Sequence, residues 1–297
     1  MTALFEYRNL YKLYFLKCIM KILILTIKLQ GGVGVVIYNI HKFLEKKGHE
    51  VEVISRNEDL GKLNMPMSIL KIRKLVREKN FDIVYTHDWS MALPLLFPFP
   101  LYIKKHFCCF HGNQRSIARI PQFFVGKLIG KRLLVVGDSL HKRFPRSKIL
   151  YNGVDIDFFY PLGKKRDSLG FIQKGTESIF ARDLEPLAKK FKLKLLVAEN
   201  ILFEKMNKDF YNKCKVFVSL PPFSAGFNLC WVEAMAAGVP MVIGNNEGVG
   251  VKLPITKVKD IKEVGELKKD IDYREWIIKS KLTWKDHVDN LLSIFRA

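Results

Sequence analysis

The sequence predicts an α/β protein with two domains, each built around a parallel sheet. Its 297 residues are enough for two domains of about 150 residues each. Short apolar runs of strand length alternate with segments whose apolar residues recur at helical spacing, which is typical of βαβ units. A charged, turn-rich connector at 161–168 interrupts this alternation, which then begins again. We therefore place the domains at 20–150 and 151–280, with the boundary close to the connector.

The first domain is predicted to open with a strand at 21–26. A flexible glycine loop at 31–34 follows it, and then a helix that ends before Gly48. Further strands are expected at 51–54, 83–85, 107–110, 133–136 and 148–151, with a helix around 69–76. Residues 1–19 precede the first strand, and we interpret them either as an N-terminal extension from an upstream start codon or as a short amphipathic surface segment.

The second domain repeats the alternation with fewer elements. Strands are expected at 169–171, 193–198, 216–220 and 239–243, and helices at 174–190 and 229–237. Because open parallel sheets bind ligands beyond the carboxyl ends of their strands, the loops that follow those ends should line one cleft. These loops are 27–34, 86–89, 111–114 and 221–228.

Positive charge is concentrated in the first half of the chain. Of the formal net charge of +21, residues 1–148 carry +16, from 26 Lys and Arg against 10 Asp and Glu. Asp88 and Asp138 enclose a stretch with no acidic residue but seven basic ones. Such a surface attracts anions, and a nucleic acid, an anionic membrane or a phosphate-bearing substrate would each satisfy it. The alternative is that the chain is simply rich in lysine and that its positive charge serves no partner.

Two classes of protein are disfavoured by composition. The longest nearly uncharged stretch, 91–103, has 13 residues and three prolines, whereas a membrane-spanning helix needs about 20 apolar residues. The five cysteines form no C-x-x-C pair, so neither a disulfide framework nor a zinc site is supported. We expect a protein of the reducing cytoplasm, with a peripheral position on the inner membrane face left open.

The glycines at 31–34 suggest a phosphate-binding turn, because they come directly before a helix N-terminus. A dinucleotide fingerprint needs a third glycine where the sequence has Ile37, and an acid where the second strand ends in Ser55 and Arg56. An NAD enzyme is therefore disfavoured. The glycines could also form only a tight turn that binds no phosphate.

The segment 219–240 carries the strongest signal. It is predicted as a strand end, a glycine loop and a helix whose N-terminus would present free N–H groups to a diphosphate. Glu233 lies one turn inside that helix among apolar residues, where an unpartnered carboxylate is costly. Two hydroxyls of a ribose would satisfy it.

These residues resemble glycosyltransferase family 4, retaining GT-B enzymes that transfer a sugar from a nucleotide donor. The motifs that carry the resemblance lie in order at 21–34, 47–51, 86–89, 152–155 and 233–240. The resemblance implies two Rossmann-like domains facing across a cleft, the first binding the acceptor and the second the donor. It also implies that a final helix, 281–297 with its core at 284–295, packs back on the first domain.

The resemblance assigns roles to individual residues. His111, Lys174 and Glu233 form the catalytic set: they lie near the transferred sugar, at the diphosphate and at the donor ribose. Further donor contacts fall on Gly31, Gly32, Gly226, Phe227, Asn228 and Leu229, and His87 and Asp88 are acceptor-side candidates. No metal or other cofactor is implied.

Plainer interpretations of these residues stay open. His111 could be bonded only to backbone, and Lys174 could be a solvated lysine at a helix start. His87 and Asp88 could simply cap the turn that follows them.

Two positions depart from the family pattern. Ala225 stands where the family has a glutamate that binds the transferred sugar, and Phe171 stands where it has a phosphate-binding arginine.

We expect a hexosyltransferase that uses a nucleotide-sugar and a glycan or lipid-linked acceptor, with retention of configuration. The alternative is a catalytically weakened homologue that binds nucleotide or glycan for a partner. Nucleic-acid binding is disfavoured, because the aromatic residues fall in apolar runs.

Overall fold

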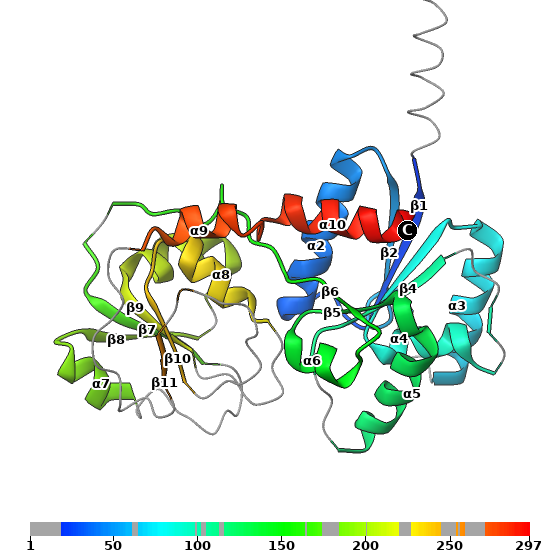
Figure 1. Cartoon of the computed structure of the whole chain (residues 1–297), viewed down its shortest axis with the longest axis horizontal. Helices are drawn as coiled ribbons and strands as arrows, with labels where there is room; N and C mark the ends of the chain where they lie inside the picture. Colours follow the sequence, from blue (N-terminus) through cyan, green and yellow to red (C-terminus); the bar gives the residue numbers. More distant parts are fainter. Residues whose placement is uncertain are drawn as a thin grey trace, which may run out of the picture. The chain divides into compact units, whose positions relative to one another are not determined.

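The computed structural model describes twelve stretches of the chain, in which helices and strands alternate (Figure 1). The described residues are 19–60, 65–98, 100–101, 105–112, 116–163, 165–173, 184–199, 201–219, 227–244, 254, 256–258 and 271–297. Apart from Ile19, the predicted N-terminal extension lies outside them. None of the helices in the described stretches is both long and apolar enough to cross a membrane.

The first sheet has six strands in the order β2-β1-β3-β4-β5-β6. They are β1 (Lys21–Thr26), β2 (Glu50–Ser55), β3 (Ile83–His87), β4 (Lys105–Phe110), β5 (Leu133–Val135) and β6 (Lys148–Ile149). Strand β1 pairs in parallel with β2 and β3, and β3 pairs in parallel with β4. The predicted strands of the first half are confirmed to within two residues, and their carboxyl ends lie at one edge of the sheet.

Helices cover both faces of this sheet. They are α2 (Gly31–Lys46), α3 (Met65–Lys79), α4 (Trp89–Leu96), α5 (Arg119–Ile129) and α6 (Asp138–Arg143). Figure 1 shows α2 on one side, and α3, α4 and α5 side by side on the other. Leu23 and Leu25 of β1 pack against Ile72 of α3 and against Met91 and Leu95 of α4. Because side chains alternate along a strand, the equally buried residues between them face α2.

The glycine segment 31–34 is not the flexible loop that the sequence predicted, because helix α2 already begins at Gly31. Gly31 has a φ of +69°, a backbone conformation that favours glycine. A Cβ at Gly34 would collide with the backbone carbonyl of Leu29. Both glycines are therefore needed for the chain to turn from β1 into the helix.

The second sheet has five strands in the order β11-β10-β9-β7-β8, paired in parallel throughout. The strands are β7 (Ser168–Ile172), β8 (Lys194–Ala198), β9 (Cys214–Ser219), β10 (Met241–Gly244) and β11 (Thr256–Val258). The accompanying helices are α7 (Glu185–Lys190), α8 (Leu229–Ala236) and α9 (Tyr273–Lys279). Three short irregular turns, Phe203–Lys205, Met206–Phe210 and Tyr211–Lys213, take the place of a full helix between β8 and β9. The predicted helix 174–190 is described only from residue 184 onwards.

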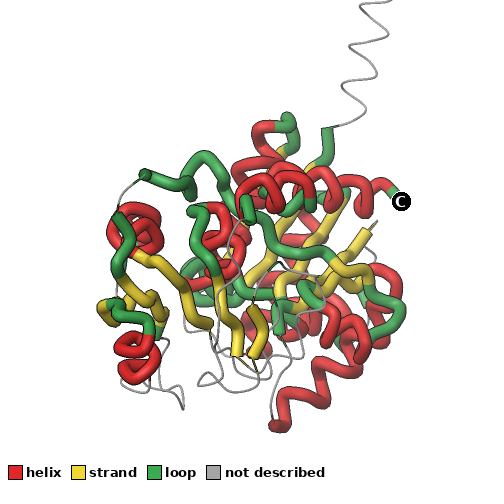
Figure 2. The backbone as a smooth tube through the Cα atoms, turned by 60° about the vertical axis from the view of Figure 1, so that its left-hand side comes forward, coloured by secondary structure: helices red, strands yellow, loops and turns green. Residues whose placement is uncertain are grey.

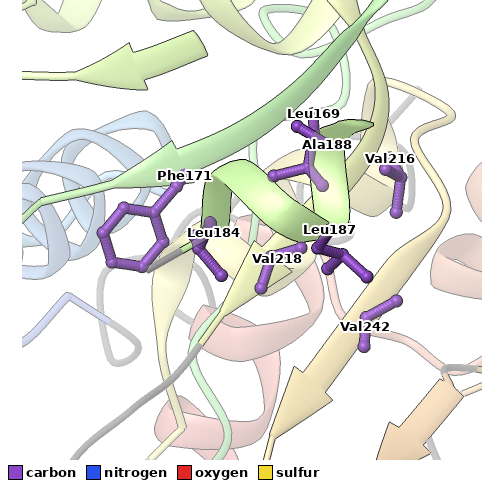
Figure 3. Close-up of a cluster of buried hydrophobic side chains, with 8 residues drawn as sticks. All are labelled: Leu169, Phe171, Leu184, Leu187, Ala188, Val216, Val218 and Val242. Carbon is purple, nitrogen blue, oxygen red and sulfur yellow. The ribbon is translucent and has the colours of Figure 1, made fainter. Parts of the chain in front are cut away.

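Helix α7 closes one face of the second sheet. Figure 3 shows side chains of this helix region directed at the strands, in a cluster of buried residues from α7, β7, β9 and β10. Its members are Leu169, Phe171, Leu184, Leu187, Ala188, Val216, Val218 and Val242. At about 25 cal/mol per Å² of buried apolar surface, such clusters supply most of the energy that stabilises a sheet with its helix.

The chain divides into two compact units. The first contains residues 1–110, 117–134 and 292–297, and the second contains 111–116 and 135–291. Figure 2 shows strands flanked by helices in both. Helix α10 (Trp284–Arg296) confirms the predicted C-terminal helix. In the first unit, Phe295 packs its ring against Tyr85 and Phe107, and its carbonyl accepts a hydrogen bond from Lys105 Nζ at 2.8 Å. The predicted domain bounds at 150 and 280 stay predictions.

Helix α8 ends in a tight glycine cap. Gly238, with a φ of +70°, donates its N–H to the carbonyl of Met235, and Val239 donates to Ala234. This is the Schellman arrangement, which needs a left-handed residue after the helix. Arg166 completes the cap, since its guanidinium donates to the carbonyls of Ala237 and Gly238 at 2.6 and 2.5 Å.

We predict that Gly238→Ala lowers the free energy of unfolding by about 2 kcal/mol, because alanine is strained at positive φ and its Cβ would crowd Pro161 Cγ at 3.1 Å. Gly163→Ala is the matched control: Gly163 has a φ of +67°, but an added Cβ would meet no atom within 4 Å, so only about 1 kcal/mol should be lost. Urea unfolding followed by circular dichroism measures both. Equal losses would show that the contact with Pro161 has no effect.

Candidate functional site

Glu233 is a buried carboxylate in the middle of an apolar helix. It lies one turn inside α8, where its side chain is 8% exposed and its neighbours Val232 and Ala234 are fully buried. The hydroxyl of Tyr211 donates a hydrogen bond to Glu233 Oε2 at 2.7 Å. This bond meets part of the cost of placing a carboxylate among apolar side chains, and it fixes the direction in which the carboxylate points.

Tyr211 is a site residue that sequence reasoning missed. It belongs to the last of the irregular turns between β8 and β9, and its fully buried ring packs edge-on against Phe159, Phe210 and Phe217. Burial first, and then the negative charge of Glu233, raise the pKa of Tyr211 well above its usual range. The hydroxyl therefore stays protonated and acts as a fixed donor. No periodic pattern marks residues 203–213, so the sequence offered no signal for this pair.

The residues before α8 are held by the Asn-Gly-Val-Asp motif at 152–155. The carbonyl of Phe227 accepts a hydrogen bond from Asn152 Nδ2 at 3.1 Å, and the ring of Phe227 packs against Tyr151 and Trp231. Asn228 is the N-cap of α8, in extended conformation and without a side-chain cap bond. The N-terminus of a helix that begins at Leu229 carries a partial positive charge, which suits an anion.

The same motif is anchored to the start of the C-terminal helix. Val154 pairs with Thr283, and its N–H donates to the carbonyl of Leu282 at 2.9 Å. A Cβ at Gly153 would come within 2.7 Å of the backbone of Thr283 and Trp284. Glycine at this position thus allows the two backbones to meet, and the position of Asn152 depends on that contact.

His111 follows directly after β4, and burial lowers its pKa to about 4, with a smaller effect from His287. The pKa of His287 is also lowered to about 4 by burial, although its Nδ1 donates to the carbonyl of Tyr151 at 2.7 Å. Both rings are therefore neutral near pH 7. A neutral imidazole can offer one donor and one acceptor to a sugar hydroxyl, but it carries no charge for a phosphate.

His87 is the last residue of strand β3, and Asp88 follows it. Asp88 has a φ of +76° and caps α4, since its Oδ1 accepts the N–H of Trp89 at 2.7 Å. Burial raises the pKa of Asp88, while this hydrogen bond acts in the opposite direction. His87 is buried and packs its ring against Tyr85, and it lies in register with Cys109 of β4. The capping interpretation is thus realised for Asp88, and an acceptor-side role for the two residues stays a prediction.

The remaining predicted donor residues are divided between described and undescribed parts of the chain. Gly31 and Gly32 form the first turn of α2. Lys174, Gly226 and Ala225 lie outside the described residues. Of the predicted set, the structure brings Phe227, Asn228 and Leu229 together with Glu233 on one helix start.

Comparison with known proteins finds a family model that matches part of the chain. The model of glycosyltransferase family 4 matches residues 30–158, which begin one residue before α2 and include the motifs at 31–34, 47–51, 86–89 and 152–155. This stretch of the chain is therefore similar to glycosyltransferase family 4. No match was found among curated protein sequences.

Solved structures share the fold of this chain along nearly its whole length. A glycosyltransferase from Rickettsia africae ESF-5 is 15% identical with a TM-score of 0.64, and the alignment covers 94% of this chain and 98% of that one. Sucrose-phosphate synthase from Thermosynechococcus elongatus is 13% identical with a TM-score of 0.61, covering 93% and 94%. HepE from Anabaena, solved with UDP-glucose, is 16% identical with a TM-score of 0.52, covering 92% and 94%. The predicted α/β fold of the GT-B class is confirmed.

We predict that Tyr211→Phe weakens binding of the nucleoside diphosphate by about three- to tenfold, because Glu233 loses the donor that orients it. In a Glu233→Gln background the same change should have a much smaller effect, since the two side chains act as a pair. Isothermal titration of the four proteins measures this coupling.

Tyr160→Phe is the control for the loss of a phenol, because Tyr160 is 43% exposed. Thermal unfolding of each variant separates lost binding from lost stability. If Tyr211→Phe binds the nucleotide as tightly as the wild type, Tyr211 does not position Glu233 for a ligand.

Proposed function

We propose that this protein transfers a hexose from a nucleotide-sugar to a glycan or lipid-linked acceptor, with retention of configuration at the anomeric carbon. The observation that carries the proposal is the buried carboxylate of Glu233, held by Tyr211 just behind the N-terminus of α8. The fold is shared with HepE solved with UDP-glucose and with starch synthase IV bound to ADP and acarbose. The match of residues 30–158 to the family model supports the same class of reaction.

In this proposal, Glu233 accepts hydrogen bonds from the ribose hydroxyls of the donor. A carboxylate that a fixed donor orients can accept hydrogen bonds from a defined direction, which suits a vicinal diol. The backbone at 227–229 and the positive end of α8 would contact the diphosphate. Lys174, carried over from the family, would add a full positive charge there.

The reaction replaces the bond between the sugar and the donor phosphate by a glycosidic bond to the acceptor. The bond between the anomeric carbon and the donor phosphate breaks, and the acceptor oxygen bonds to that carbon on the same face of the sugar. The proton of the acceptor hydroxyl passes to the departing phosphate oxygen. Negative charge grows on the leaving diphosphate, where the helix end and Lys174 would stabilise it without a metal ion. Neutral His111 would hydrogen-bond a hydroxyl of the transferred sugar.

A weakened homologue is the second candidate, and one observation favours it. Phe171 occupies the position of the family's phosphate-binding arginine, is 2% exposed and belongs to the apolar cluster under α7 (Figure 3). This position therefore offers no cation to a phosphate. With Ala225 in place of the sugar-binding glutamate, such a protein would bind nucleotide or glycan and assist a partner enzyme.

A thermal-shift screen over UDP, GDP and ADP and their sugars tests both candidates. A ligand at 100 times its dissociation constant stabilises a fold by about 2.7 kcal/mol, which gives a measurable shift. A shift accompanied by release of sugar from the nucleotide identifies a transferase and names its donor. A shift without any turnover supports the binding protein, and no shift with any nucleotide contradicts both.

We predict that the protein binds a nucleoside diphosphate almost as tightly as the matching nucleotide-sugar, because Ala225 offers no acceptor to the transferred sugar. A hydrogen bond to a charged group contributes about 1.5–3 kcal/mol, so Ala225→Glu should raise the preference for the sugar form by roughly 10- to 150-fold. Titration of both ligands decides the matter. A large wild-type preference for the sugar form would point to another sugar-binding residue.

The charge of the first half supports an anionic membrane as a further partner. A lipid-linked acceptor would place the enzyme at a bilayer surface, and juxtamembrane basic segments are attracted to anionic lipids in a salt-sensitive way. The net charge of +16 on residues 1–148 agrees with such a position. We propose peripheral association with the inner face of a membrane, and we expect no nucleic-acid partner.

A further inference from the structure

Helix α5 presents an apolar face to solvent. Ile117, in the short turn before the helix, is 83% exposed, and Ile120, Phe124 and Leu128 are each about 60% exposed. Together with Phe123, which is 38% exposed, they form what we call the α5 ridge. Scattered exposed apolar residues are normal on soluble proteins, but five within twelve consecutive positions mark an interaction surface.

The ridge follows from the helical repeat. Residues 117, 120, 124 and 128 recur every three or four positions, so they lie along one side of the helix. The opposite side is buried and includes a polar residue, Gln122, beside Val125 and Gly126. The helix therefore turns the more apolar of its faces away from the protein, which is the reverse of a helix that only covers a sheet.

Positive charge surrounds the ridge. Lys127 lies on α5 itself, Lys131 lies in the short turn that follows the helix, and Arg119 and Arg132 are exposed close to its two ends. The ammonium group of Lys127 lies 5.3 Å from the centre of the Phe123 ring, so the lysine stem runs along the apolar surface. No acidic residue occurs between Asp88 and Asp138 to offset these charges.

We infer that the α5 ridge is the surface by which this protein docks on an anionic lipid bilayer. With 11 residues, α5 is too short to cross the bilayer and would lie parallel to its plane. The apolar side chains would enter the boundary between headgroups and acyl chains, and the lysines would reach the lipid phosphates. The inference rests on the proposed membrane association and assigns that role to named residues.

The composition of the ridge favours a membrane over a protein partner. Lysine is depleted from the buried centre of protein interfaces, because its charge is costly to desolvate there. Here one lysine lies on the same helix as phenylalanine, leucine and isoleucine, a second follows in the next turn, and this stretch of sequence contains no acid. That mixture is typical of helices that lie in a membrane interface.

Co-sedimentation of the full chain with vesicles tests the inference. One set of vesicles contains phosphatidylglycerol and phosphatidylcholine, and the other contains phosphatidylcholine alone. The apolar variant is Phe124→Gln with Leu128→Gln, matched by Leu202→Gln with Ile278→Gln at exposed apolar positions elsewhere. The charge variant is Lys127→Gln with Lys131→Gln, matched by Lys205→Gln with Lys208→Gln. Glutamine is chosen because it keeps helix propensity.

We expect the wild type to bind the anionic vesicles and to bind neutral ones much more weakly. The apolar variant should lose at least about tenfold in partitioning, because two exposed apolar side chains no longer enter the bilayer. The charge variant should lose most of the salt dependence, and both matched controls should behave like the wild type. Each variant must keep the wild-type melting temperature.

Three results would overturn the inference: a wild type that binds neither kind of vesicle, an apolar variant that sediments like the wild type, or a wild-type dimer in solution that the apolar variant abolishes. The last would assign the ridge to contact between two copies. The thermal shift with nucleotides is measured separately. Vesicle binding by a chain that no nucleotide stabilises would contradict the proposed transferase while supporting the docking surface.

Discussion

The second unit is arranged around the need to give a buried carboxylate a partner. Glu233 lies in α8 among apolar side chains, where an ionised group without hydrogen bonds would be strongly destabilising. Tyr211 provides the partner only because the chain between β8 and β9 makes tight irregular turns instead of a helix. The adjacent Asn212 fixes those turns, since its amide donates to the carbonyls of Tyr160 and Asn207 and its oxygen accepts the N–H of Leu162.

Helix α8 is thereby held at three points by segments distant in sequence. Asn152 bonds the residue that leads into it, Tyr211 bonds its middle, and Arg166 bonds the carbonyls at its end. Such a helix cannot shift or rotate without breaking hydrogen bonds to buried groups, each of which would then lack a partner. This rigidity suits the donor site proposed above, since preorganised donors need no rearrangement when charge develops.

How well the sequence predicted this arrangement depends on how far apart in the chain the interacting residues lie. Strands such as β1 and β9 were predictable because most of their residues are buried and apolar. Glu233 was predictable because a lone acid in an apolar helix requires a partner. The identity of that partner was not, because Tyr211 lies 22 residues away in a segment without periodicity. Helix α5 was not predicted either, since its outward apolar face is unlike the pattern of a helix that covers a core.

The departures at the donor site have a physical consequence for catalysis. A helix N-terminus supplies the equivalent of about half an elementary charge, and a lysine supplies one. Together they offset less than the charge of a departing nucleoside diphosphate, and an arginine at position 171 would normally add another unit. Phe171 instead packs in the apolar cluster under α7, where burying a guanidinium without an acid would be costly. Restoring the arginine by itself would therefore destabilise the sheet before it reached a phosphate. In the proposed reaction, the leaving group would rely on α8 and on Lys174, which favours slow transfer over loss of donor binding.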